Sequence, residues 1–437
     1  STPPLLPAVS PPPPADPPLP IDLTADNDNV ASQPVEVPGC GMASQKSETG
    51  PGKRYPRSKG MKESKRLRRQ KARAAKAALT GPRDCKMWSS ISRAYSQPLA
   101  IEVKFSVSML TAVKLTYVGL SDPRKDHGVW TLEDYLSGRL GQRFKLMEWD
   151  GNEPRVLCTT EGHQIGIMPS MPKDKDWLST VESVASLMEK VRLEGAGRWK
   201  GKQLVGRRGD FVAVNVGTAY GLGHKFPANL KNRGREGLVN KLLADPGVQQ
   251  IAGFGSSVLK TYAPKIFKHY ADSLDTLYAS GGPCTSVFRN SVFPTAAFNL
   301  GPRCVCRGHK DNTNVPHGLC AITAMGTFNY KKGGHLVLWD LGLIIEFPPG
   351  ATILIPSSTL HHGNTAIGKD ERRYSFTQYC MGGLLRWVRY GLRPANSLSR
   401  KERELIDGDI THTSREAMAM FSKVTELQKD RDAYLTA

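Results

Sequence analysis

Two histidines and one aspartate constrain the fold of this 437-residue chain more than any other feature. His309 and Asp311 are two residues apart, so on an extended strand both side chains point to the same side. His362 follows 53 residues after His309, so a second strand must fold back to bring it beside the pair. Two imidazoles and one carboxylate on one face of a metal leave coordination positions open. The spacing therefore predicts a non-haem Fe(II) site.

The third ligand could come from either of two adjacent histidines, His361 and His362. Only one of them can face inward on a strand, because successive side chains alternate. We predict His362, which gives the shorter step to Arg373 and directly precedes Gly363. His361 is then expected to face solvent or to support the ligands from behind.

Arg373 follows His362 by eleven residues and shares one face of a predicted strand with Ser375. A buried arginine there can hold the distal carboxylate of 2-oxoglutarate in a bidentate fork. Together with the metal ligands, this spacing predicts a 2-oxoglutarate-dependent oxygenase.

The region around these residues has the pattern of a β-sandwich or barrel, because short apolar runs alternate with Gly, Pro and Asp turns. Strands are expected at 99–107, 209–216, 335–340, 343–347, 351–356 and 371–379. Helices are expected at 130–136 (capped by Thr131 with Asp134), 179–188, 234–245, 256–279 (where Pro264 starts a new helix or kinks it), 400–406 and 414–429. The predicted fold class is α+β, with a double-stranded β-helix (jelly-roll) core that helices brace.

Several runs in this region resemble the TET/JBP family of nucleic-acid methyl oxidases, and they are most similar to its branch in mushroom-forming fungi. The resemblance covers about residues 290–392 and rests on the segments 298–303, 309–314, 333–341, 345–357 and 375–387. It implies stepwise oxidation of the methyl group on a flipped DNA base by Fe(II), oxygen and 2-oxoglutarate, with ascorbate as a reductant in vitro. The implied substrates are 5-methylcytosine, oxidised to its hydroxymethyl, formyl and carboxyl forms, and 6-methyladenine.

The resemblance also implies roles for single residues. His309, Asp311 and His362 match the iron ligands, and Arg373 matches the arginine at the distal carboxylate of the co-substrate. Arg303 lies near the position of an arginine at the proximal carboxylate. Asn314 occupies a position at which relatives contact the base, although a turn-forming asparagine is an equal alternative.

A glycine-rich loop at 217–223 lacks the Lys-Ser/Thr of a nucleotide-binding loop. It is instead a candidate lining for a base pocket or a duplex groove. The candidate residues are Asn215, Tyr220 and His224. Phe211, Tyr220 and Phe376 are candidate stacking partners for the base.

The ends of the chain differ in composition from the middle. Residues 1–52 hold thirteen prolines and are expected to be a disordered tail. Residues 53–80 form a basic segment, suited to nuclear targeting or to a DNA-binding arm. The expected further parts are a mixed α/β region at 85–290, the catalytic core at 291–392 and C-terminal helices at 393–437. In the tail, Ile21–Leu23 resembles a motif that binds SUMO by adding to a sheet edge.

The net charge of +20 favours a polyanionic partner. Residues 1–52 contribute −5 and residues 53–76 contribute +11, so the remaining residues carry +14. The expected partner is double-stranded DNA with a methylated base, and the expected protein is a nuclear monomer without a membrane segment. The eight cysteines lack C-x-x-C spacing and are expected to be free thiols.

Two other classes of function remain open from the sequence. The same iron ligands serve oxygenases that act on RNA or on proteins. A catalytically inactive DNA-binding protein that recruits partners is the second alternative, although an inactive protein need not keep all of the ligands.

Overall fold

We describe the chain from a computed structural model, which covers residues 98–106, 112–113, 117–121, 128–200, 206, 208–221, 223–408 and 416–435. The chain divides into two units, residues 1–57 and residues 58–437, and every described residue belongs to the second. The predicted tail (1–52), the basic segment (53–80) and the SUMO-binding motif at Ile21–Leu23 lie outside the described residues.

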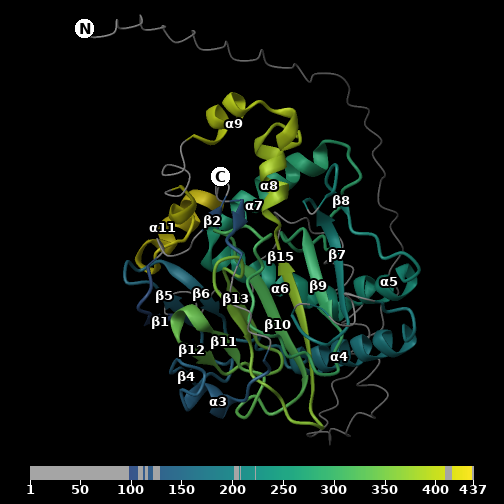
Figure 1. The fold of residues 1–437 in the computed structure, drawn as a ribbon, viewed down its shortest axis with the longest axis vertical. Coiled ribbons are helices and arrows are strands. Elements are labelled where there is room, and N and C mark those ends of the chain that lie inside the picture. The colour runs from purple at the N-terminus through teal and green to yellow at the C-terminus, as the bar shows by residue number, and fades with distance from the viewer. Residues whose placement is uncertain are drawn as a thin grey trace, which may run out of the picture. The chain divides into compact units, whose positions relative to one another are not determined.

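The second unit is a mixed α+β structure built on a nine-stranded sheet (Figure 1). The strand order is β1 (Leu99–Glu102), β5 (Arg155–Cys158), β6 (Gln164–Met168), β13 (Thr352–Ile355), β10 (Cys320–Thr327), β15 (Arg372–Tyr379), β9 (Thr295–Asn299), β7 (Ala213–Ala219) and β8 (Ala228–Asn229). All neighbours are antiparallel except β1 and β5. Strands from both sides of residue 290 therefore share one sheet.

A second sheet has four strands, in the order β14 (His362–Asn364), β11 (Leu336–Leu338), β12 (Leu343–Ile345) and β4 (Lys145–Met147). Alternation divides its apolar side chains between two sides. Leu336 and Leu338 belong to the main hydrophobic core, whereas Val337 packs in a smaller cluster with Tyr135 and Phe144. A short pair, β2 (Ala112–Val113) and β3 (Val118–Gly119), completes the described strands.

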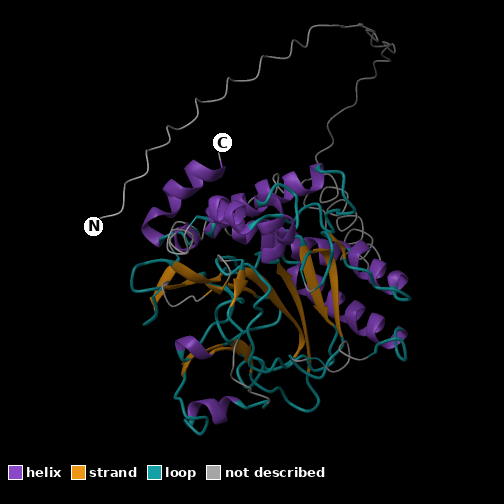
Figure 2. Cartoon of the chain, turned by 45° about the horizontal axis from the view of Figure 1, so that its top comes forward, coloured by secondary structure: helices purple, strands orange, loops and turns teal. Residues whose placement is uncertain are grey.

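Helices cover one face of the large sheet, and the small sheet and long loops lie on the other side (Figure 2). The helices are α3 (Leu132–Leu136), α4 (Trp177–Glu194), α5 (Glu236–Ala244), α6 (Pro246–Tyr262), α7 (Pro264–Ala279), α8 (Gly382–Arg389), α9 (Arg400–Asp407) and α11 (Leu427–Leu435). No helix in the described ranges is long and apolar enough to cross a membrane.

Helix α6 shows how the sequence sets this layer. It begins at Pro246, whose missing N–H costs nothing in the first turn, and Asp245 accepts hydrogen bonds from the backbone of Gly247 and Val248. Most of its remaining residues are buried, which suits a helix between a sheet and other helices. The carbonyl of Ala252 accepts a hydrogen bond from Gln378 on β15, so the helix is tied to the sheet.

Most expected elements are present, with shifted ends. The capping box of Thr131 and Asp134 is confirmed at the start of α3, and Pro264 begins a separate helix rather than kinking one. The prediction of one helix over 414–429 was wrong, because residues 420–426 form turns, a bridge and a 3-10 segment before α11 begins. The six cysteines within the described ranges are free thiols, as predicted.

A buried histidine, His317, is expected to make the stability of the fold sensitive to acid. His317 is 8% exposed, and its ring centroid lies 5.5 Å from that of His269 on α7. Burial, with smaller contributions from His269 and Arg389, lowers the pKa of His317 to about 3. As pH falls, the imidazole of His317 is protonated near pH 6.5 in the unfolded chain but only near pH 3 in the folded chain. The free energy of unfolding should therefore fall as pH drops from 6.5 towards 3.

Between pH 7 and pH 4.5, we expect this one group to contribute about 2 to 3 kcal/mol of that loss. Urea unfolding of the metal-free protein at pH 7 and pH 4.5 measures it. His317→Gln should reduce the difference between the two pH values, whereas the same change at exposed His224 should not. An unchanged difference in His317→Gln would contradict this explanation.

Candidate metal centre

The two histidines predicted to bind the metal are brought together by backbone pairing between distant segments. His309 lies in a one-residue antiparallel bridge with His362, and each backbone N–H donates to the other's carbonyl at 3.0 Å. His362 begins strand β14, as predicted, but His309 lies in an extended loop rather than in a regular strand. The bridge places the two imidazoles side by side, with ring centroids 4.4 Å apart.

Asp311 completes a cluster with the geometry of a metal site. One ligand atom from each of His309, Asp311 and His362 lies within 4.8 Å of the others, and the three residues could hold a metal ion. The Nε2 atoms of His309 and His362 lie 3.7 and 3.8 Å from the Asp311 carboxylate. Both histidines are 5% exposed, whereas the Asp311 side chain is 18% exposed, so the cluster opens on the aspartate side.

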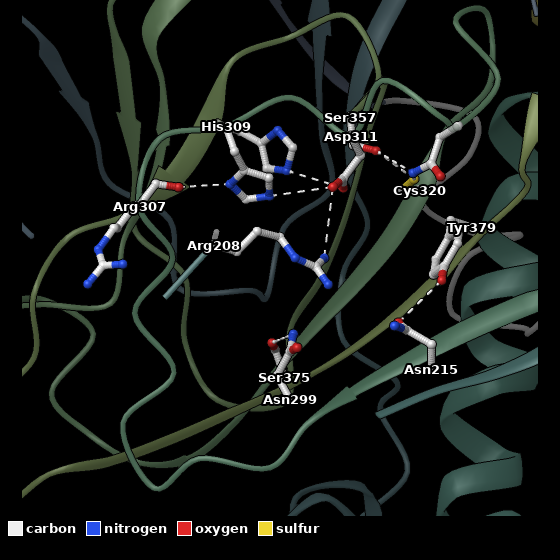
Figure 3. Close-up of polar contacts among 12 residues, drawn as sticks. Arg208, Asn215, Asn299, Arg307, His309, Asp311, Cys320, Ser357, Ser375 and Tyr379 are labelled. Atoms are coloured by element: carbon white, nitrogen blue, oxygen red, sulfur yellow. Dashed lines mark hydrogen bonds and ion pairs between the residues drawn. The ribbon is translucent and has the colours of Figure 1, made fainter. Parts of the chain in front are cut away.

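The ring nitrogens are oriented for ligation. Nδ1 of His309 donates to the carbonyl of Arg307 at 2.8 Å, as Figure 3 shows, and Nδ1 of His362 donates to the carbonyl of Leu360 at 2.9 Å. A carbonyl only accepts, so the proton of each ring is on Nδ1 and the lone pair of Nε2 points towards Asp311. Burial, followed by the neighbouring His362, holds the pKa of His309 well below its usual value. The neutral form that binds metals is therefore favoured.

The loop that carries Asp311 is held by a second polar cluster. The backbone N–H of Asp311 donates to the carbonyl of Ser357 at 2.9 Å, and that of Asn314 donates to the carbonyl of Asp311 at 2.8 Å. The Asn314 amide donates to the hydroxyl of Ser357 at 3.1 Å and to the thiol of Cys320 at 3.3 Å. Asn314 is 5% exposed, and its amide nitrogen is hydrogen-bonded within the protein. These contacts hold the loop that carries Asp311 in place.

His361 does not face solvent, which corrects one of the two expectations for it. It is 1% exposed and its ring packs on Trp339 at 4.5 Å between centroids. Its backbone N–H donates to the Asp340 carboxylate at 2.6 Å. The alternation of the strand thus sends His361 away from the metal ligands and His362 towards them.

Arg373 lies on β15 and is buried, with 1% exposure. One terminal nitrogen donates to the carbonyl of Cys304 at 2.9 Å, and the guanidinium lies 5.7 and 5.8 Å from the ring centroids of Phe328 and Phe347. Its Nε has no hydrogen-bond partner, and no carboxylate within the described ranges pairs with it. Burial lowers the pKa of Arg373, because the charge is removed from water. A buried cation of this kind needs an anion.

His335 adds a second buried nitrogen without a hydrogen-bond partner next to Arg373. It is 0% exposed, and both its backbone N–H and its Nδ1 meet the hydroxyl of Thr365, at 3.1 and 2.8 Å. The hydroxyl accepts from the backbone N–H, and it can either donate to Nδ1 or accept from it, so either ring nitrogen of His335 can carry the proton. The other ring nitrogen, Nε2, is buried without a partner. Burial, followed by the charge of Arg373, lowers the pKa of His335 to about 4, so the ring is neutral at pH 7.

The other two predicted co-substrate residues differ in placement. Ser375 is buried on the same face of β15 as Arg373, and its hydroxyl accepts a hydrogen bond from Asn299 at 2.8 Å. Arg303 is exposed, and its guanidinium donates to the carbonyl of Ile367 at 3.0 Å. Arg208 is the arginine that points at the cluster instead, with a terminal nitrogen 3.9 Å from the Asp311 carboxylate (Figure 3).

The candidate base-binding residues divide between two faces of the sheet. Asn215 on β7 is exposed, and its side-chain oxygen accepts a hydrogen bond from the Tyr379 hydroxyl at 3.3 Å. Tyr379 shares a face of β15 with Arg373 and Ser375. Phe376 lies on the opposite face and packs on Phe298 and Phe288, so the suggestion that it stacks on a base was wrong.

Tyr220 is 7% exposed and packs edge-on against Trp387 of α8, with ring centroids 4.9 Å apart. Phe211 is also buried, at 6% exposure. Both rings are therefore largely covered by protein, and Tyr379 is the more available aromatic side chain beside Asn215.

The sequence analysis missed Arg208, His335 and Tyr379. A signal for Tyr379 was present, because it continues the alternation of Arg373 and Ser375 along one strand. His335 directly precedes β11, which pairs with the strand of His362. Arg208 had no local signal, since its place next to Asp311 depends on contacts between segments about a hundred residues apart.

Similarity to known proteins was found only among solved structures. No family model matches the chain, and no curated protein matches it. A solved structure described as NgTET1 in complex with 5mC DNA is similar over 58% of this chain and 90% of that chain, with 18% sequence identity and a TM-score of 0.39. A likeness of this degree does not assign the chain to a family.

Proposed function

We propose that this protein is an Fe(II)- and 2-oxoglutarate-dependent dioxygenase that oxidises the methyl group of a methylated base in DNA. The proposal rests on the cluster of His309, Asp311 and His362, together with the buried Arg373, which pairs with no carboxylate among the described residues. A facial set of two histidines and one carboxylate suits Fe(II) and leaves positions for co-substrate and oxygen.

The proposed core is a double-stranded β-helix. Its two sheets are formed by strands β13, β10, β15 and β9 on one side and β14, β11 and β12 on the other. The metal ligands lie where the two sheets meet, since His362 begins β14 and Asp311 is hydrogen-bonded to Ser357, just beyond β13. An interior between two sheets excludes water, which an oxidising centre requires.

The donor set fits a dicarboxylate. Arg373 has an unpartnered Nε, and His335 offers a second buried donor beside it in the tautomer that carries its proton on Nε2. Both donors would bind the distal carboxylate of 2-oxoglutarate, with the Ser375 hydroxyl as a third candidate. Arg208 would bind an anionic group nearer the metal, a role proposed here in place of Arg303.

When bound, iron and 2-oxoglutarate activate oxygen and supply the oxidant that hydroxylates a methyl group. The protein orients the reacting groups and keeps water away. His309, Asp311 and His362 hold the metal, and Arg373 with His335 fixes the far end of the co-substrate. Asn215 and Tyr379 offer an amide and an aromatic ring where a base could be bound.

A methylated DNA base is the proposed substrate for two reasons. The motifs of residues 290–392 resemble methyl oxidases of nucleic acids, and the chain carries a net charge of +20. A base inside a duplex cannot reach a buried centre, so it must be flipped out of the stack. Stacking on Tyr379 and hydrogen bonding to Asn215 would hold the flipped base.

The test is an assay on duplexes with 5-methylcytosine or 6-methyladenine. Purified protein is incubated with Fe(II), ascorbate and 2-oxoglutarate, and the nucleosides are quantified by mass spectrometry beside an Asp311→Ala control. Oxidised cytosine, or loss of methyl from adenine, that is absent from the control supports the proposal and identifies the base. No product on either duplex despite bound iron and co-substrate would refute it and direct the search to RNA or protein substrates.

A further inference from the structure

We propose that the tip of the β7–β8 hairpin, residues 223–226, is a DNA-contacting element in which Phe226 stacks on a base and Lys225 contacts the phosphate backbone. This inference rests on the proposed function, because it takes the substrate to be duplex DNA. It adds a surface that none of the metal or co-substrate residues provides.

The hairpin borders the metal-binding loop. Gly221 lies against the side chain of Met381, since a Cβ on Gly221 would be 4.0 Å from the Met381 methyl carbon. Met381 pairs through its backbone with Asn314, and the Asn314 N–H donates to the carbonyl of Asp311. A duplex whose base enters at Asp311 would therefore pass close to the hairpin.

The base of the hairpin is anchored, and its tip is exposed. Tyr220 packs on Trp387, and Pro227 is buried at the other end. Gly221 and Gly223 adopt φ values of 122° and 91°, which side chains rarely allow, so the turn depends on glycine. Phe226 is nevertheless 53% exposed. The tip therefore presents a large aromatic ring to solvent on a loop whose two ends are anchored.

The charge around the tip favours a polyanion. Residues 211–235 contain no aspartate or glutamate, and they include Lys225, Lys231, Arg233 and Arg235. On the neighbouring helix, Arg386 lies close enough to Tyr220 to oppose the rise in pKa that burial causes there. Phosphates attract such a surface, and exposed aromatic rings stack on bases that have left the duplex stack, whatever their sequence.

The experiment measures binding of the full chain to an unmodified and a methylated duplex by fluorescence anisotropy, at several salt concentrations. The variants are Phe226→Ala, Phe226→Trp and Lys225→Ala. The control for Phe226→Ala is Tyr434→Ala, which removes an exposed ring from α11. The control for Lys225→Ala is Lys369→Ala, which lies just before the first residue of β15, far along the strand from Tyr379. The increase in melting temperature with metal and 2-oxoglutarate checks that each variant is folded.

Phe226→Ala should weaken binding about 5- to 50-fold, the effect of losing one stacked base, and Phe226→Trp should restore it. Lys225→Ala should reduce the slope of log affinity against log salt by about 0.9, the effect of one phosphate contact. If both variants bind like the controls while the wild type binds and oxidises DNA, the hairpin inference is overturned and the proposed function stands. If the wild type binds neither duplex, the proposed function itself fails.

Discussion

Replacing His362 by alanine should abolish metal binding and activity, whereas replacing the adjacent His361 by alanine should leave metal binding intact. The reason is the direction of each ring. Nε2 of His362 faces Asp311 at 3.8 Å, while His361 packs on Trp339 on the other side of the strand. Removing a ligand takes away a bond to the metal, and removing His361 takes away packing.

The His361→Ala variant should instead lose stability, by about 2 to 4 kcal/mol, because a fully buried ring leaves a cavity. Anaerobic calorimetry with Fe(II) separates the two effects, and urea unfolding of the metal-free proteins measures the second. His361→Phe provides a control that keeps the packing on Trp339. Retention of Fe(II) affinity in His362→Ala, or its loss in His361→Phe, would show that the ligand has been assigned to the wrong residue.

The cluster of His309, Asp311 and His362 could be predicted from the sequence because its residues are marked by local spacing. His309 and Asp311 are two residues apart, and the choice of His362 over His361 followed from strand alternation and from the distance to Arg373. The structure places His309, Asp311 and His362 together. Strand alternation held even though His309 lies in a bridge rather than in a regular strand.

The residues that were missed depend on how strands pair, which spacing does not reveal. Tyr379 contacts Asn215 because β15 and β7 lie on either side of β9 and pair with it. Ala297 on β9 pairs with Thr377 of β15 and with Asn215 of β7, which sets the register between the two outer strands. Likewise, the parallel pairing of β12 with β4 joins residues about 200 positions apart, and no local pattern predicts it.

Element ends were predicted less well than element types, for a physical reason. Strand β7 was expected at 209–216 but spans Ala213–Ala219. Its ends are set by backbone pairing with β9, which runs from Asn299 to Thr295, and not by the extent of its own apolar residues. The pairing continues through Gly217, which has a φ of 96° and lies against the carbonyl of Pro294. The glycines that suggested a loop thus permit a close approach within the sheet.

Replacing Arg373 by methionine is expected to stabilise the protein without co-substrate and to abolish 2-oxoglutarate binding. The guanidinium is 1% exposed, and no carboxylate within the described ranges pairs with it. Within the described residues, its guanidinium donates a hydrogen bond to the carbonyl of Cys304. An uncompensated buried charge is costly, and an apolar side chain of similar length suits the nearby rings of Phe328 and Phe347.

The gain in the free energy of unfolding should be about 1 to 4 kcal/mol for the metal-loaded, co-substrate-free protein. With the wild type, 2-oxoglutarate at a hundred times its dissociation constant should add about 2.7 kcal/mol. In Arg373→Met that increment should vanish while the metal-induced increment remains. Adding the co-substrate should therefore reduce or reverse the difference in stability between Arg373→Met and the wild type.

Arg373→Lys separates charge from geometry in the same experiment. Lysine keeps the cation but lacks the planar fork, so 2-oxoglutarate should bind weakly and the co-substrate-free protein should stay as unstable as the wild type. Differential scanning calorimetry with and without 2-oxoglutarate measures all three proteins. If Arg373→Met is less stable than the wild type without co-substrate, the guanidinium serves the fold through Cys304 and its surrounding rings. If it still gains the full increment from 2-oxoglutarate, the co-substrate carboxylate is held elsewhere.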